Sequence, residues 1–130
     1  MTFAAASAQS TPGGALAFDA FVPSPHFLER KPGQRFVNGR FAHGKLGEVI
    51  WEESSSFDPA THLSHVTWYW STPTDADFLT SSLQLRQIYP EEWPALLASG
   101  GLHLTACYGG FDRRPFDTQS FHQICVCERV

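Results

Sequence analysis

The sequence is poor in charge and has little basic character. Only 17% of its 130 residues are Asp, Glu, Lys or Arg, and 9 basic residues stand against 13 acidic ones, for a net charge of -4. Proteins that bind nucleic acid gather Lys and Arg on one face to neutralise phosphates. The basic residues here are scattered along the chain, so the composition argues against a nucleic-acid partner.

Long apolar stretches are absent, and cysteine is scarce. The N-terminal MTFAAASAQST has no basic start and no sustained apolar run, so it does not resemble a signal peptide, and no later stretch is long enough to cross a membrane. The three cysteines, Cys107, Cys125 and Cys127, form an odd set without the spacing of a disulfide framework. We expect buried, reduced thiols and a cytoplasmic location.

The sequence also lacks the motifs of a cofactor or metal site. Its glycine pairs, at 13–14, 100–101 and 109–110, are all at predicted turns, and no Gly-x-Gly-x-Gly opens a helix after a strand. The six histidines have no further ligands at metal-binding spacing, so we predict no metal. A single histidine acting as general base stays open, with His65 and His122 as the candidates. Asp19, inside a predicted strand, is either a strand-end carboxylate or a polar group at a pocket rim.

Alternation of apolar and polar residues between short turns is the main pattern present. It predicts an antiparallel meander of four strands. The predicted strands are Gln34–Ala42, Val49–Phe57, Leu63–Ser71 and Phe78–Ile88. Residues 1–11 lack an apolar repeat and are expected to form a flexible arm. Residues 12–130 are expected to form one domain, with residues 33–88 as an antiparallel insertion.

The stretch from Leu83 to Asp112 reads as strand, helix, strand and turn. Pro90 suits a first helical position, and the two glutamates after it favour a helix N-terminus. Gly100-Gly101 ends that helix, and alternation from Leu102 to Tyr108 predicts the next strand. Another strand is expected over Ala15–Val22, followed by a helical turn that Ser24 would cap. The fold class is therefore α+β.

A family resemblance rests on the order of these motifs. The run R-x-x-YP-EE-W-x-x-LL-x-x-GGL, followed by YGGFD, RPF and a last strand, resembles the C-terminal part of class I S-adenosylmethionine-dependent methyltransferases. The segment PGGALAFDAFVP at residues 12–23 resembles their fifth strand. The resemblance implies a three-stranded remnant sheet in the order five, seven, six, with one or two helices. It also implies an antiparallel insertion that borders the substrate pocket.

The departure from that family concerns the cofactor. The half that carries the glycine-rich turn and the acidic residue for the ribose does not occur in this sequence. We therefore expect no cofactor for the isolated chain, and S-adenosylmethionine only where a partner supplies the other half. The resemblance also implies a substrate-binding set, for which the alternative is core packing or, for the arginine, an ion pair with Glu91 or Glu92. The set comprises Arg86, Tyr89, Tyr108, Phe111 and Phe116.

The strand at Ala15–Phe21 has an unpaired edge in such a fold, because its usual neighbour is absent. Natural proteins rarely leave an apolar edge bare. We expect a homodimer through this strand, with a partner chain or the N-terminal arm as alternatives. Three functions stay open. They are a non-catalytic methyltransferase-like domain that binds a small apolar ligand or an assembly partner, the substrate-side half of a methyltransferase completed by another chain, and an unrelated small-molecule-binding module.

Overall fold

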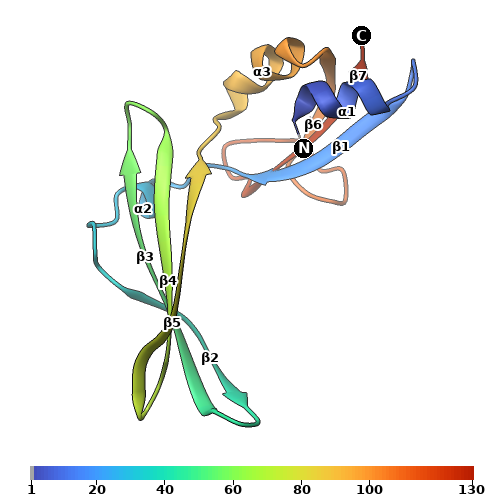
Figure 1. The fold of residues 1–130 in the computed structure, drawn as a ribbon. Helices are drawn as coiled ribbons and strands as arrows, with labels where there is room; N and C mark the ends of the chain where they lie inside the picture. The colour runs from blue at the N-terminus through green and yellow to red at the C-terminus, as the bar shows by residue number, and fades with distance from the viewer. Residues whose placement is uncertain (1) are drawn as a thin grey trace. The chain divides into compact units, whose positions relative to one another are not determined.

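The computed structural model describes residues 2–130 and divides the chain into two compact units (Figure 1). The first unit joins the residues up to Pro23 to the segment Ile88–Val130, and the second unit spans Ser24–Gln87. Each unit is built on one antiparallel sheet, with few helices, so the predicted α+β class is confirmed. None of the helices in residues 2–130 has the length and apolar character needed to span a membrane.

The elements follow the predicted order closely. The helices are α1 (Phe3–Gln9), α2 (Pro25–Leu28), the 3-10 helix η1 (Pro90–Glu92) and α3 (Trp93–Ser99). The strands are β1 (Ala15–Phe21), β2 (Phe36–His43), β3 (Gly47–Asp58), β4 (Leu63–Thr72), β5 (Asp75–Arg86), β6 (Leu102–Tyr108) and β7 (His122–Arg129). The four meander strands lie within a few residues of their predicted ends, because alternation and turn residues are local signals. Ser24 stands at the N-cap of α2, but its side chain makes no capping bond.

The sheet of the first unit has the strand order β1-β7-β6. β7 runs antiparallel to both neighbours, so β1 and β6 are parallel to each other. This is the order five, seven, six that the resemblance implied. This strand order argues against the alternative of an unrelated module whose motif order resembles the family by chance.

One face of this sheet carries the core of the first unit. The buried residues are Trp93, Leu97, Leu102, Cys125 and Cys127. Gln123 is fully buried among them, and it is satisfied by three hydrogen bonds: its Oε1 accepts from the Trp93 indole, and its Nε2 donates to the carbonyls of Phe21 and Ile88. These bonds tie β1, β7 and the segment before η1 together, because an unpaired buried amide would be costly.

The flexible arm expected over residues 1–11 is in part a helix. Residues 3–9 form α1, with the Thr2 side chain accepting from the Ala5 backbone at the N-cap, while Met1 lies outside the described residues. Phe3 packs against Phe18 and Trp93, with ring centroids 5.5 and 6.3 Å apart. A single aromatic residue on a short alanine-rich helix thus supplies the contact that a search for an apolar repeat does not detect.

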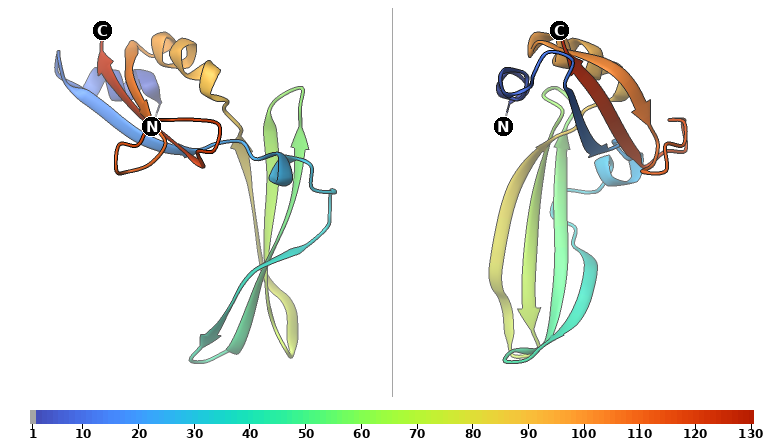
Figure 2. Two further views of the ribbon diagram at one scale, coloured as in Figure 1. Left: turned by 180° about the vertical axis from the view of Figure 1, so that it is seen from behind. Right: turned by 90° about the vertical axis from the view of Figure 1, so that its right-hand side faces the viewer.

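The second unit is a twisted meander in the order β2-β3-β4-β5, which Figure 2 shows as four adjoining strands. Cross-strand pairing of Trp51 with Trp70, and of Val66 with Leu83, places the large apolar side chains on one face. We call it the tryptophan face. The opposite, polar face carries Tyr69 together with Thr80 and Ser82 of β5.

Candidate functional site

The strongest candidate site lies in the first unit, where β1 and β6 end. β1 and β6 run in the same direction on either side of β7, so their carboxyl ends lie at the same end of the sheet. β1 ends at Phe21, which pairs with His122 at the start of β7, and β6 ends at Tyr108, which pairs with Ile124. Loop residues after Tyr108 close this end of the sheet. We call the group formed by Asp19, Phe21, Tyr108, Phe111 and His122 the edge site.

A histidine–carboxylate pair is the polar centre of the edge site. Nδ1 of His122 lies 3.0 Å from Oδ1 of Asp19, although the two residues are 103 positions apart in the sequence. Both side chains are partly exposed, at 48% and 40%. A carboxylate only accepts hydrogen bonds, so Nδ1 carries the proton in this bond, and an imidazole with its single proton there has a lone pair on Nε2. Nε2 is therefore the atom available to a ligand.

Aromatic side chains surround this pair. The ring of Phe111 lies 5.8 Å from the imidazole of His122, centroid to centroid, and 75% of Phe111 is exposed. Phe21, on β1, is 53% exposed. Phe21 and Phe111 thus add exposed apolar surface next to the polar pair, since Phe21 pairs with His122 across β1 and β7.

The loop that holds Phe111 in place depends on two glycines. The Gly109 N–H donates to the Arg114 carbonyl at 2.9 Å, and Tyr108 forms an isolated bridge with Pro115. A side chain at Gly109 would collide with Ser120, and one at Gly110 would meet Arg114 at 2.6 Å. At Gly109 the close approach of Ser120 and of the Pro115 carbonyl leaves no room for a side chain, whereas at Gly110 the contacts are with exposed side chains that can move.

The five residues predicted for substrate binding do not all meet at one point. Tyr108 and Phe111 belong to the edge site, and Phe116 lies half-buried in the same loop. Tyr89 precedes η1, where its backbone N–H donates to Oε2 of Glu92 at 2.7 Å. Arg86 ends β5 in the second unit, and its guanidinium contacts the His62 ring and the Gln87 carbonyl.

Sequence reasoning did not bring Asp19 and His122 together. Each was singled out alone, Asp19 as a polar group at a pocket rim and His122 as a possible base. Only the register of β1 on β7 makes them neighbours. The other candidate base, His65, is exposed on β4, where its Nδ1 lies 3.4 Å from the Gln84 amide.

The glycine pairs do not form a cradle for a cofactor. A side chain at Gly14 would meet the Thr11 carbonyl at 2.9 Å, and one at Gly100 would meet Phe3 at 2.5 Å. These glycines are explained by the close approach of the chain to itself. An S-adenosylmethionine site needs free backbone N–H groups and an acidic residue for the ribose, and the close contacts at Gly14 and Gly100 leave no room for a ligand beside these two glycines.

The cysteines are free thiols on the core side of the first sheet. Cys107 pairs directly with Cys125 across β6 and β7. Burial, with a smaller contribution from Cys107, raises the pKa of the Cys125 thiol to about 12. Within residues 2–130, no group of three or more His, Cys, Asp or Glu side chains converges as metal ligands would. A thiol with so high a pKa is a poor nucleophile.

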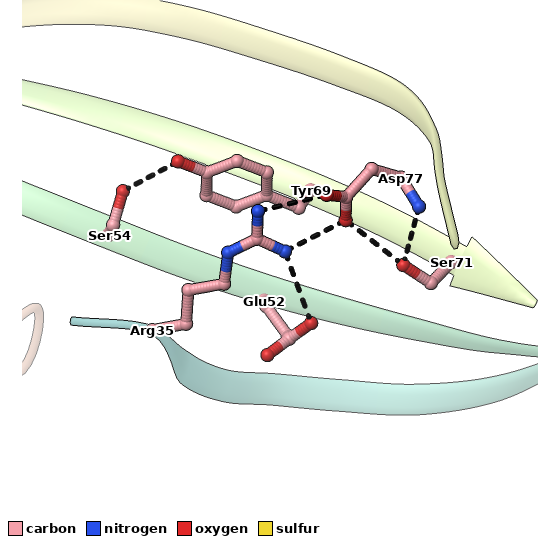
Figure 3. Close-up of polar contacts among 6 residues, drawn as sticks. All are labelled: Arg35, Glu52, Ser54, Tyr69, Ser71 and Asp77. Carbon is pink, nitrogen blue, oxygen red and sulfur yellow. Dashed lines mark hydrogen bonds and ion pairs between the residues drawn. The ribbon is translucent and has the colours of Figure 1, made fainter. Parts of the chain in front are cut away.

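A polar cluster on the second unit serves a structural purpose (Figure 3). The Arg35 guanidinium donates two hydrogen bonds to the Asp77 carboxylate, at 2.8 and 2.9 Å, and stacks 3.6 Å from the Tyr69 ring. Ser71 bonds both the backbone and the carboxylate of Asp77. Asp77 has a positive φ of 51°. The cluster clamps the irregular start of β5 to the segment before β2.

Comparison with known proteins gives matches in structure alone. No protein-family model matches the chain, and neither does any curated protein sequence. The fold is similar to the CcbJ methyltransferase from Streptomyces caelestis (TM-score 0.74, 20% identity, 98% of this chain and 51% of that chain). It is also similar to an S-adenosylmethionine-dependent methyltransferase from Clostridium acetobutylicum (TM-score 0.70, 13% identity, 98% and 49%). A third similar structure is the sugar N-methyltransferase KedS8 from a Streptoalloteichus species (TM-score 0.61, 17% identity, 98% and 47%).

These matches concern the fold. Almost all of this chain superposes on each of the three proteins, whereas it spans about half of their length. The chain therefore has the fold of part of a methyltransferase.

Proposed function

We propose that this chain is the acceptor-side half of an S-adenosylmethionine-dependent methyltransferase. In this proposal it binds the molecule to be methylated at the edge site, and the cofactor-binding half lies outside residues 1–130. The observation that carries the proposal is the superposition of 98% of the chain on about half of CcbJ with a TM-score of 0.74. In this proposal the chain alone is inactive, since Gly14 and Gly100 pack against its own residues and are not open to a cofactor.

The open edge of β1 supports the proposal that a neighbouring strand comes from outside this chain. The Val22 N–H donates to the Phe121 carbonyl at 2.8 Å, so the even-numbered residues of β1 bond to β7. The odd-numbered residues, from Ala15 to Phe21, turn their backbone groups to the other side. An apolar strand with a bare edge accepts a further strand. We infer that the cofactor-binding half supplies it.

The acceptor class we propose is an amine on a sugar-like molecule. The proposal rests on the fold shared with the sugar N-methyltransferase KedS8 and on the chemistry of the edge site. A primary or secondary amine loses a proton when a methyl group is added to its nitrogen. Nε2 of His122 is free to accept that proton while Asp19 holds the other ring nitrogen. The rings of Phe21 and Phe111 offer apolar surface for a sugar ring.

The test is an NMR titration of the chain with glucosamine, with glucose as the matched compound without an amine. We expect glucosamine to shift the signals of Tyr108, Phe111 and His122, and His122→Asn to weaken binding roughly tenfold through the lost acceptor. His103→Asn, an exposed histidine near the start of β6, is the control and should leave the affinity unchanged. Shifts spread elsewhere, or equal responses to both sugars, would contradict the proposal.

Calorimetry with S-adenosylmethionine tests the other part of the proposal. We expect no binding heat from the isolated chain. Binding of the cofactor at micromolar concentration would show that residues 1–130 hold a cofactor site of their own, and would overturn the division into halves.

The alternative occupant of the same edge is β1 from a second copy of the chain. It corresponds to a non-catalytic domain that dimerises through Ala15–Phe21. Amide hydrogen exchange distinguishes the two: self-pairing slows exchange at Ala17 and Asp19 as the chain is concentrated. If these amides exchange rapidly at every concentration, the edge is free for another strand.

A further inference from the structure

The edge of the second sheet at β5 is long and regular, and its central segment is uncharged. β5 spans Asp75–Arg86, and its segment Phe78–Leu85 contains no charged residue, proline or glycine. Its pairing with β4 continues without interruption from Leu63 opposite Arg86 to Trp70 opposite Leu79. Most of its residues are exposed. Proteins usually protect such an edge with charges, prolines or bulges, because it accepts strands from other chains.

The edges at β2 and β6 are better protected. β2 has a bulge between Val37 and Gly39 and carries Arg40. β6 has a register shift between Leu104 and Ala106. In β5 the irregularity lies at the hairpin end, next to Thr72, and leaves the central part of the strand flat. Bulges twist an edge away from incoming strands, so β5 is the more receptive edge of its sheet.

The backbone groups that β5 presents can be identified. The Gln87 N–H donates to the His62 carbonyl at 2.8 Å, so the odd-numbered residues of β5 bond to β4. The even-numbered residues, among them Thr80, Ser82 and Gln84, turn their N–H and carbonyl groups outward. Their side chains lie on the polar face, where the Ser82 hydroxyl is 3.2 Å from that of Thr67. The edge therefore combines free backbone groups with small hydroxyl side chains.

A hollow of about 350 Å³ lies on β4 and β5. It is lined by His65, Val66, Thr67, Ser82, Leu83 and Gln84. The hollow is shallow and open to solvent, with no enclosed wall to hold a small molecule. It leaves room for a side chain from a strand added alongside.

The charges at the two ends of β5 have opposite signs. Asp75 and Asp77 stand at its start and Arg86 at its end, with the uncharged segment between them. Two copies of β5 that pair antiparallel bring each acidic end beside the basic end of the other copy. An axis at Ser81 sets Thr80 opposite the second copy's Ser82 and Arg86 opposite the second copy's Ala76. Hydroxyl pairs and opposite charges both stabilise cross-strand contacts.

We propose that a second copy of this chain pairs with the β5 edge, antiparallel about a twofold axis at Ser81. The two meanders then form one continuous sheet. A twofold arrangement uses the same surface on both copies, so association stops at the dimer. This interface is distinct from the β1 edge, which the proposed function assigns to the cofactor-binding half.

The experiment combines sedimentation equilibrium with site-resolved hydrogen exchange over a roughly hundredfold range of concentration. We expect the mass to rise from 14.5 kDa to twice that value, with exchange slowing at the Thr80 and Ser82 amides. The amides of Ala17 and Asp19 should be unaffected. A constant mass of 14.5 kDa, masses beyond a dimer, or protection at Ala17 and Asp19 in place of β5 would each overturn the proposal.

Two variants test the register. Ser82→Pro removes an outward donor and the hydroxyl bond to Thr67, but leaves the backbone bonds between β4 and β5 in place, and should weaken the dimer at least about tenfold. Thr80→Lys places a charge at the centre of the interface and should also weaken the dimer. This second variant keeps the proposal testable if the proline variant folds poorly. Thr74→Lys adds the same charge in the turn before β5 and should leave the dimer intact. An unchanged dimer in both edge variants would refute the model.

Binding of glucosamine at the edge site should be the same in Ser82→Pro as in the parent chain. Failure of the dimer and failure of the proposed function are thus separate results.

Discussion

Glu53 is a hydrogen-bonded carboxylate on the tryptophan face of the second unit. Its carboxylate accepts hydrogen bonds from Arg30 at 2.7 Å and from Asn38 and Trp68 at 2.9 Å each. Burial by itself would raise the pKa of the Glu53 carboxyl, but these three donors outweigh it and hold the pKa below the usual value of 4.5. A carboxylate bonded in this way links β2, β4 and the segment after α2 to β3.

A pH-dependent loss of stability follows for Glu53. Because its folded pKa is lowered, its contribution is complete above about pH 4.5 and is lost as the pH falls through the folded pKa. Glu53→Gln should reduce the free energy of unfolding by about 1–2 kcal/mol at pH 7. The difference between parent and variant should shrink below pH 4.5 in urea titrations.

The matched control for Glu53 is Glu48→Gln. Glu48 pairs with Arg40 at 3.3 Å, and both side chains are 58% exposed. An exposed pair contributes little, so this variant should change the free energy of unfolding by less than about 0.5 kcal/mol. A pH profile of Glu53→Gln that runs parallel to that of the parent would show that Glu53 titrates normally.

At the scale of elements, the docking of α1 on α3 depends on a glycine. Gly100 ends α3, and a side chain there would meet Phe3 at 2.5 Å and the backbone of Ala4 at 3.0 Å. The atoms on the α1 side are largely backbone, which cannot move aside as a flexible side chain can. Gly100 therefore fixes how closely α1 approaches.

Gly100→Ala should displace α1 from the core of the first unit. Phe3 then loses its ring contacts with Phe18 and Trp93, at a cost of about 1–3 kcal/mol in the free energy of unfolding. Trp93 fluorescence during urea unfolding measures the change, and proteolysis near α1 should become faster. Gly44→Ala, where an added side chain meets nothing within 4 Å, is the control. Equal stability of the two variants would mean that α1 is not docked as described.

At the scale of the whole molecule, the chain combines open sheet edges and exposed aromatic rings with a small net charge. Phe111 and Phe121 are 75% and 82% exposed, and both β1 and β5 present unpaired backbone groups. The net charge of -4 at pH 7 vanishes near the isoelectric point of about 5.8. Charge repulsion is what keeps such surfaces apart in solution.

Solubility should therefore be lowest near pH 5.8. Light scattering at fixed concentration across the pH range would show the minimum. Thr80→Lys adds one positive charge and should move the minimum to higher pH while making it shallower, because it also protects the β5 edge. Scattering that does not depend on pH would indicate that the edges are already covered in solution.

The sequence by itself determined the elements. Strands alternate with a period of two and turns need particular residues, so the meander from Phe36 to Arg86 and the unit from Pro90 to Tyr108 were predictable from neighbouring residues. The order of motifs also predicted the sheet order of the first unit through the family resemblance. The same resemblance predicts Tyr108 and Phe111 as substrate-binding residues, which stays a prediction.

Tertiary structure alone decided which distant residues meet. Asp19 and His122 are 103 positions apart, and no local pattern in either strand records their pairing. The docking of Phe3 on Trp93 and the three donors around Glu53 likewise depend on packing between elements. Local preferences act over a few residues of backbone, whereas register and packing are set when side chains far apart in the sequence compete for the same buried space.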